Sequence, residues 1–225
     1  MIRSFRLAGL LALCGVLPTP GSAQESLTSE PTLAADSVAR RLLVDVRTLD
    51  TTIVIEARYA TLNNFTNAVL PGYHANRVFL RREAAAALAR VQRRLLSGGM
   101  GLKVFDGYRP MRATRAMVAW AEASGQRHLI AEGYIASRSR HNLGLAVDLT
   151  LVDWSMGGRE VDMGTPYDTF SAAAHYASAT GRTLRYRQLL RRMMEEEGFR
   201  QYEREWWHYS LSVPGEPVAF DLEVR

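Results

Sequence analysis

The sequence predicts a protein of the α+β class that folds as one domain. Its 225 residues are 47% hydrophobic, which is enough to bury one substantial core. Segments that favour strands and segments that favour helices follow one another without the strict alternation of a doubly wound parallel sheet. The chain has no internal repeat and no low-complexity tract, so a solenoid or a disordered array is not indicated.

The first 23 residues have the composition of an export signal. The basic start MIRSFR precedes the apolar run LAGLLALCGVL and the small residues of PTPGSA. This order is typical of a secretory signal peptide, and we expect cleavage after Ala23 and a periplasmic or secreted protein. The alternatives are a short buried helix, or a lipoprotein anchored at Cys14, although Leu13 is larger than the residue that usually precedes such a cysteine.

Charge and cysteine content exclude several kinds of site. Cys14 is the only cysteine, so a mature chain without it has no disulfide, cysteine nucleophile or thiolate metal ligand. The formal charge is +5, and loss of Arg3 and Arg6 with the signal leaves a mildly basic chain. Its arginines are scattered among acids, so nucleic-acid binding is not indicated. No later apolar run reaches the length of a membrane span. The oligomeric state is not predicted.

The elements of the N-terminal half are expected in the following order. Residues 24–42 are small and polar, which predicts a flexible mature N-terminus before a domain over 43–225. Alternating β-branched residues over 43–58 predict one or two strands. Asparagine, proline and glycine are frequent over 63–78, which predicts a loop, and residues 81–97 have the pattern of a helix that two glycines end.

The C-terminal half continues the mixture of strands and helices. Pro110 is placed to open a helix, as proline often does in the first turn. Gly198 is placed to close the last helix. We expect strands over 102–108, 144–151 and 205–211, helices over 111–124 and 184–197, and a turn-rich loop over 153–168.

The stretch SRHNLGLAVDLTL carries a histidine and an acid that suggest a buried site. His141 lies just before the expected strand, where a loop can direct it into a cleft. Asp148 lies within the strand, and a buried charge is costly unless it is paired or binds a metal. A salt bridge from Asp148 to an arginine is the alternative interpretation. His74, His128 and His175 have no supporting neighbours and are expected to be structural or surface residues.

A second pair of candidate residues lies in EREWWHYS, near the C-terminus. Glu205 and His208 are three positions apart, and residues three apart in a regular strand face opposite ways. A bulge or the end of a strand is therefore needed to bring them together. The alternative is a core strand with a glutamate at its rim. Two histidines and one aspartate would complete the three protein ligands of a catalytic zinc, which leaves the glutamate as a general base.

Arg109 follows the strand expected at LKVFDGY and precedes Pro110. A guanidinium fixed at such a corner can stabilise a developing oxyanion, although an arginine that caps its own loop has the same pattern.

These motifs resemble those of the zinc D-Ala-D-Ala peptidases. SRHNLGLAVD fits their Ser-x-His-x-x-Gly-x-Ala-x-Asp signature, and EWWH fits their Glu-x-x-His signature. With RYATLNNFTN, DGYRP and DMGTPYD, the resemblance is greatest to the VanX-type D-alanyl-D-alanine dipeptidases, and it extends from about Val44 to the C-terminus. It implies hydrolysis of D-Ala-D-Ala and a central antiparallel sheet that carries the zinc, with helices packed against it.

The resemblance also implies a role for each site residue. His141, Asp148 and His208 correspond to the ligands of one zinc ion, Glu205 to the base that activates the zinc-bound water, and Arg109 to the residue that polarises the scissile carbonyl. Four further residues are expected to line a small dipeptide pocket: Tyr59, Asp106, Ser139 and Asp168.

Two other functions share these motifs. A D,D-carboxypeptidase that trims peptidoglycan stem peptides would have the same zinc site in a cleft open at one end. A non-catalytic zinc-binding or wall-binding module would not require the base Glu205 or Arg109.

Overall fold

The computed structural model describes residues 32–215 and 217–225. The predicted signal peptide lies outside these residues, as do Cys14 and the expected cleavage site. In the described part, strands and helices form one α+β domain with a central sheet, which confirms the predicted fold class. No helix in this part is long and apolar enough to cross a membrane.

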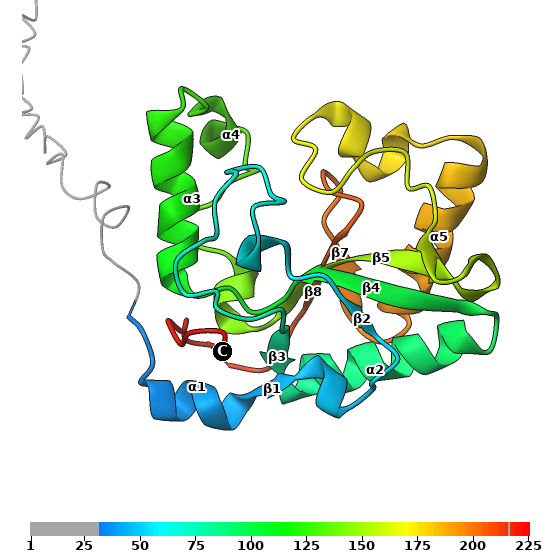
Figure 1. Cartoon of the computed structure of the whole chain (residues 1–225), viewed down its shortest axis with the longest axis horizontal. Coiled ribbons are helices and arrows are strands. Elements are labelled where there is room, and N and C mark those ends of the chain that lie inside the picture. Colours follow the sequence, from blue (N-terminus) through cyan, green and yellow to red (C-terminus); the bar gives the residue numbers. More distant parts are fainter. Residues whose placement is uncertain (1–31, 216) are drawn as a thin grey trace, which may run out of the picture. The chain divides into compact units, whose positions relative to one another are not determined.

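The central sheet has the strand order β2-β4-β5-β8-β7, with β6 paired to the far end of β5 (Figure 1). All pairs are antiparallel except the edge strand β2, which runs parallel to β4. A separate antiparallel pair is formed by β1 and β3. The strands are β1 (Leu43–Asp45), β2 (Val54–Ile55), β3 (Phe79–Arg81), β4 (Met100–Asp106), β5 (Ala146–Asp153), β6 (Arg159–Glu160), β7 (Phe199–Gln201) and β8 (His208–Leu211).

Helices pack around this sheet. Helices α2 and α5 pack against the sheet and against each other, and α3 and α4 form a separate pair (Figure 1). The α-helices are α1 (Asp36–Leu42), α2 (Arg82–Leu96), α3 (Met111–Ala123), α4 (His128–Ala131) and α5 (Gly181–Glu195). Short 3-10 helices are η1 (Val46–Thr48), η2 (Arg58–Ala60), η3 (Arg140–Leu143), η4 (Trp154–Met156), η5 (Ala172–Ala174) and η6 (Tyr176–Ser178).

The predicted flexible segment 24–42 is wrong in its C-terminal part. Residues 36–42 form α1, and Ala39 in this helix is completely buried. The amide of Ala34 donates to the carbonyl of Ala219, 2.9 Å away, and so ties the segment to the C-terminal region. Only a few apolar side chains anchor α1, which explains why the polar composition concealed it.

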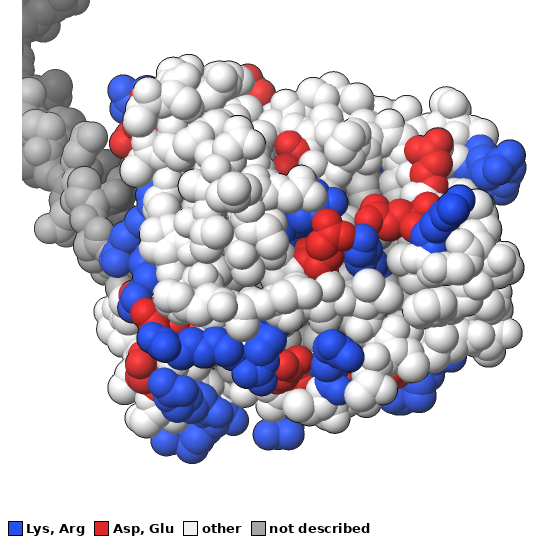
Figure 2. All heavy atoms as spheres, in the orientation of Figure 1, with Lys and Arg blue, Asp and Glu red and all other residues white. Residues whose placement is uncertain are grey.

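The helices α1 and α2 turn their arginines outward. Arg40, Arg41, Arg82 and Arg93 are exposed, whereas the alanines and leucines on the opposite side of α2 are buried. Figure 2 shows basic side chains gathered along the lower margin of the molecule, over these two helices. This separation of apolar and charged faces is the amphipathic pattern that predicts a surface helix.

Candidate functional site

The register of the sheet aligns three candidate residues in one row. Asp148 on β5 pairs with Asp106 on β4 and with His208 on β8. Side chains of directly paired residues project from the same face of a sheet, so these three lie side by side. Asp106 is 1% exposed and Asp148 is 3% exposed, so two carboxyl groups are buried at the centre of the fold.

A short 3-10 helix delivers His141 to the same row. The Ser139 side chain caps η3 by accepting from the His141 amide, 3.2 Å away. Gly144 then adopts a φ of +68°, a left-handed conformation that favours glycine and turns the chain from η3 into β5. The Nδ1 atom of His141 lies 2.6 Å from the carbonyl oxygen of Gly107. This contact leaves Nε2 directed at Asp148 and His208.

The donor atoms of His141, Asp148 and His208 have the spacing of a metal site. His141 Nε2 lies 3.1 Å from His208 Nδ1 and 3.3 Å from Asp148 Oδ1, and the last two atoms are 2.9 Å apart. Donors held tetrahedrally at about 2.0–2.2 Å from zinc are roughly 3.3–3.6 Å apart, so these spacings lie at or slightly below that range. Among the residues that the structure describes, this group could therefore hold a metal ion.

The protonation states of these residues suit a metal. Burial acts to raise the pKa of Asp148, but His141 and His208 outweigh it and hold the pKa below its usual range. Burial lowers the pKa of His208, although its hydrogen bond to Asp148 opposes this change. An ionised carboxylate and a neutral imidazole are the forms that coordinate metals.

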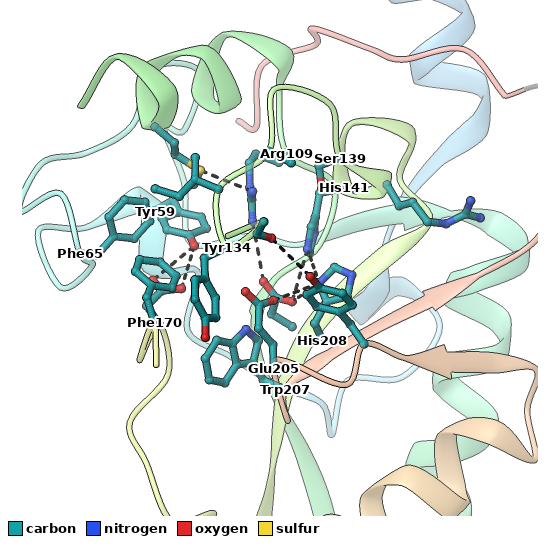
Figure 3. Close-up of a pocket in the computed structure, with 18 of the residues that line it drawn as sticks. Tyr59, Phe65, Arg109, Tyr134, Ser139, His141, Phe170, Glu205, Trp207 and His208 are labelled. Atoms are coloured by element: carbon teal, nitrogen blue, oxygen red, sulfur yellow. Dashed lines mark hydrogen bonds and ion pairs between the residues drawn. The ribbon is translucent and has the colours of Figure 1, made fainter. Parts of the chain in front are cut away.

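Glu205 lies in the turn that leads into β8. The amide of His208 donates to the Glu205 carbonyl, and β8 begins at His208, so the two side chains are related by a turn and not by a regular strand. Glu205 Oε2 consequently lies 4.0 Å from His208 Nδ1, on the same side of the site (Figure 3). Burial, followed by the charges of Asp148 and Asp168, raises the pKa of Glu205 well above its usual value.

Arg109 is held beside the three candidate metal ligands by Asp106. Its Nε and Nη2 atoms donate to Asp106 Oδ2 at 2.9 and 2.7 Å, and Nη2 lies 3.7 Å from Asp148 Oδ2. The guanidinium also stacks over the ring of Tyr59, 5.0 Å from its centre. Asp106 accepts a third hydrogen bond from the Tyr73 hydroxyl at 2.6 Å, so both carboxylate oxygens of this buried charge pair have a hydrogen-bond donor.

These residues surround a cavity of about 280 Å³. Such a volume is near the lower end of the roughly 300–1,000 Å³ that is usual for ligand pockets, so it suits a small molecule. Tyr59, Ser139 and Asp168, three of the four residues expected in the dipeptide pocket, line this cavity. Asp106 does not line it, because this side chain lies behind Arg109. Aromatic side chains form much of the wall: Phe65, Tyr134, Phe170 and Trp207 (Figure 3), together with Tyr202.

Asp168 lies within the wall of the cavity. The Tyr59 hydroxyl lies 3.1 and 3.3 Å from its two carboxyl oxygens, within hydrogen-bond distance of both. No helix begins at Thr169, so Asp168 does not act as a helix cap. The residue instead has a φ of +60°, an uncommon conformation for a residue with a side chain and one that fixes its direction. Burial, followed by the charge of Asp148, raises the pKa of Asp168 to about 8.

Several site contacts are absent from the sequence predictions. The hydroxyl of Tyr167 reaches both Tyr59 and Asp148, Tyr73 supports Asp106, and the Gly107 carbonyl orients His141. Tyrosines are common core residues, so nothing in their spacing distinguishes these two. Gly107 lies just after β4, and its place in the DGYRP motif is the sequence signal that points to it.

Comparison with known proteins gives consistent matches. Residues 40–221 match the family model described as D-ala-D-ala dipeptidase. The chain is 34% identical to the D-alanyl-D-alanine dipeptidase of Enterococcus faecium over 186 residues, which cover 76% of this chain and 92% of the relative. A protein of the same name from Enterococcus faecalis is 36% identical over 69% of this chain and 84% of the relative. A third, from Streptomyces coelicolor, is 34% identical over 75% of this chain and 91% of the relative.

Proposed function

Because the chain belongs to the D-ala-D-ala dipeptidase family and is a peptidase, we propose that it hydrolyses the dipeptide D-Ala-D-Ala to two D-alanines with one zinc ion per chain. The observation that carries the proposal is the grouping of three donor atoms beside Glu205 and Arg109 in a small cavity. His141, Asp148 and His208 would hold the zinc, which when bound lowers the pKa of a water molecule and polarises a carbonyl.

Glu205 acts as the general base in this proposal. Its carboxylate lies beside His208, where it takes the proton from the attacking water and passes it to the leaving amine. Proton transfer is most effective when the pKa of the group is close to the working pH, and burial raises the pKa of Glu205 from its usual acidic range. The aromatic side chain of Trp207 also lines the cavity and limits the access of bulk water.

Arg109 stabilises the negative charge that develops on the scissile carbonyl oxygen. A guanidinium that is already oriented by two hydrogen bonds to Asp106 needs little reorganisation when that charge appears. Its permanent positive charge and its place at the cavity suit this role, and the stacking on Tyr59 keeps it aligned.

Asp168 and Tyr59 are positioned to bind the ammonium group of a free dipeptide. The cavity is lined by the acidic side chains of Asp148, Asp168 and Glu205. In this proposal Asp148 holds the metal and Glu205 is the base, which leaves the Asp168 carboxyl for the ammonium group. Ser139 lines the wall beside His141 and can donate to the peptide. An ammonium partner favours a dipeptide with a free amino group over a longer wall peptide, in which that nitrogen is an uncharged amide.

A substrate panel tests this specificity. Purified zinc-loaded protein is incubated with D-Ala-D-Ala, its N-acetylated form and a peptidoglycan stem peptide that ends in D-Ala-D-Ala, and released D-alanine is measured. We expect release from the free dipeptide and at least tenfold less from the other two, since a lost charge-assisted contact is worth about 1.5–3 kcal/mol. Equal release from the acetylated dipeptide would favour the D,D-carboxypeptidase alternative.

We further propose that the protein is exported, with its mature form beginning at Gln24. The order of basic, apolar and small residues in the first 23 positions supports this proposal. N-terminal sequencing of protein from the periplasm or the medium should start at Gln24. Active protein that keeps Met1 in the cytoplasm would contradict it, and a lipid on Cys14 would favour the anchored alternative.

A further inference from the structure

Two tyrosine hydroxyls join the proposed metal ligand Asp148 to the proposed ammonium-binding residue Asp168. Asp148 Oδ2 lies 3.0 Å from the hydroxyl of Tyr167, which lies 2.9 Å from the hydroxyl of Tyr59. The Tyr59 hydroxyl lies 3.1 Å from Asp168 Oδ1. The four side chains come from β5, η2 and the loop after β6, and the two tyrosines are buried, at 8% and 2% exposure.

The three contacts that join these four side chains need more protons than the two tyrosine hydroxyls provide. Three oxygen–oxygen contacts of 2.9–3.1 Å are favourable only if each contains a proton, because two oxygens without one repel each other. Tyr59 and Tyr167 supply one proton each. If both end carboxyls are ionised, Tyr59 donates to Asp168 and Tyr167 donates either to Tyr59 or to Asp148, so one contact stays without a proton.

The third proton belongs on Asp168 and not on Asp148. Asp148 is close to the nitrogens of His141 and His208, which favour its ionised form. At Asp168 the charge of Arg109 acts to lower the pKa, but burial and the charge of Asp148 outweigh it and raise the pKa to about 8. The titratable and charged groups that act on it or adjoin it are Tyr59, Asp106, Arg109, Asp148, Tyr167 and Glu205.

We propose that Asp168 carries a proton in the ligand-free protein, and that Tyr59 and Tyr167 form a directional hydrogen-bond chain which links ammonium recognition to the metal ligand Asp148. In this state Asp168 donates to Tyr59, Tyr59 donates to Tyr167, and Tyr167 donates to Asp148, so every contact contains one proton. Tyr167 is a positioning residue, because it acts through Asp148 and Tyr59 and not on the substrate.

Binding of an ammonium group at Asp168 reverses the direction of these hydrogen bonds. This step rests on the proposed function. The ammonium binds ionised Asp168, and the displaced proton leaves to solvent, so charge and protons balance. Tyr59 then donates to Asp168 and Tyr167 donates to Tyr59. Asp148 loses the hydrogen bond from Tyr167, which leaves more negative charge on this carboxylate for the metal. Occupation of the ammonium subsite therefore changes the ligand strength of Asp148.

Titration of Asp168 tests the proposal. The carboxyl carbon of Asp168 is followed by ¹³C NMR in the zinc-loaded, ligand-free protein, and its signal is assigned by its loss in Asp168→Asn. In the parent we expect Asp168 to be protonated at pH 6 and to titrate at a higher pH, because burial and the hydrogen bond to Tyr59 favour the proton. Tyr167→Phe keeps the ring but removes the hydroxyl that favours the protonated state, so the midpoint should fall by roughly half to one pH unit, the equivalent of one hydrogen bond.

Tyr108→Phe is the matched control. Its buried hydroxyl donates to the Leu222 carbonyl, outside the chain, so the Asp168 midpoint should stay at the parent value. Asp168 ionised at pH 6 in the parent, or an equal midpoint in the parent and Tyr167→Phe, would overturn the proposal. D-alanine release from D-Ala-D-Ala is measured on the same preparations. Its absence would refute the proposed function, whereas the NMR result decides the hydrogen-bond chain independently.

Discussion

Glu205 is expected to contribute to catalysis but not to metal binding. It lies 4.0 Å from a nitrogen of His208 but is not part of the three-residue donor group. We predict that Glu205→Ala keeps zinc at the parent occupancy and loses about a hundred- to ten-thousand-fold in turnover, the usual contribution of a general base. Metal analysis and D-alanine release on one preparation check both parts. A loss below about tenfold would mean that another group activates the water.

Asp168 is expected to make the stability of the folded protein depend on pH. Its pKa of about 8 in the folded protein is above the value of about 3.9 in an unfolded chain. The folded state therefore binds the proton more tightly, so the stabilisation from protonated Asp168 is fully present below about pH 4. It is lost progressively as the pH rises to about 8, at up to about 1.4 kcal/mol per pH unit.

Asp168→Asn should abolish this dependence, because an amide does not titrate. Denaturant unfolding of the metal-free parent and the variant, from pH 5 to 9, measures the difference. We expect the parent to lose stability relative to Asp168→Asn by a few kcal/mol as the pH rises to 8, and the difference to be constant above that. A difference that does not change with pH would show that Asp168 is already ionised at pH 5.

At the scale of elements, the turn after β4 sets the orientation of His141. A Cβ atom added at Gly107 would lie 2.5 Å from Val78 Cγ1 and 2.8 Å from the Phe79 carbonyl oxygen, so the turn would have to move. Because the Gly107 carbonyl contacts His141 Nδ1, we predict that Gly107→Ala weakens zinc binding by roughly 10–100-fold. It should also destabilise the fold by about 1–3 kcal/mol.

Chelator competition and denaturant unfolding measure the two effects. Gly98→Ala is the control, since the nearest atom to an added Cβ there is the Leu95 carbonyl oxygen at 3.5 Å. This variant should keep the zinc affinity of the parent. Parent-like zinc affinity in Gly107→Ala would show that the carbonyl does not orient the histidine.

The elements that sequence could predict are those with enough residues to show a pattern. Helices α2, α3 and α5 were expected within a few residues of their observed bounds, because each has an apolar period and a proline or glycine at an end. Helix α1 has seven residues, and β2 and β6 have two each, which is too short for a period to be distinguished from chance. Their positions depend on tertiary packing.

Part of the candidate site could likewise be predicted from the sequence, and part of it could not. The motif spacing named His141, Asp148, Glu205 and His208, and the structure places them together. It could not show that Asp106 lies behind Arg109, or that Tyr167 reaches Asp148, because both contacts depend on the register of β4 and β5 and on a loop conformation. The question of how Glu205 and His208 meet was left open by the sequence, and the turn before β8 answers it.

At the scale of the whole molecule, the metal site connects distant parts of the chain. His141 comes from η3, Asp148 from β5 and His208 from β8, so a bound ion would cross-link the centre of the domain. A ligand that binds only the folded state stabilises it by about 2.7 kcal/mol at a hundredfold excess over its Kd. For a domain of this size that corresponds to a rise in Tm of roughly 5–10 °C.

We predict this rise when zinc is added to metal-free protein, and its loss in His208→Ala. The control is His175→Ala, because this histidine contacts Tyr134 and is not a member of the donor group. Differential scanning calorimetry with and without zinc provides the measurement. A zinc-dependent rise in His208→Ala equal to that of the parent would remove His208 from the ligand set.

We propose above that this chain uses zinc, held by His141, Asp148 and His208, to hydrolyse D-Ala-D-Ala. The most direct test measures D-alanine released from this dipeptide by one preparation in three states: as zinc-loaded protein, after chelation, and after zinc is restored. We expect two D-alanines per dipeptide in the first state, none in the second and full recovery in the third. Unchanged release after complete removal of the metal, or no release from the zinc-loaded protein, would contradict it.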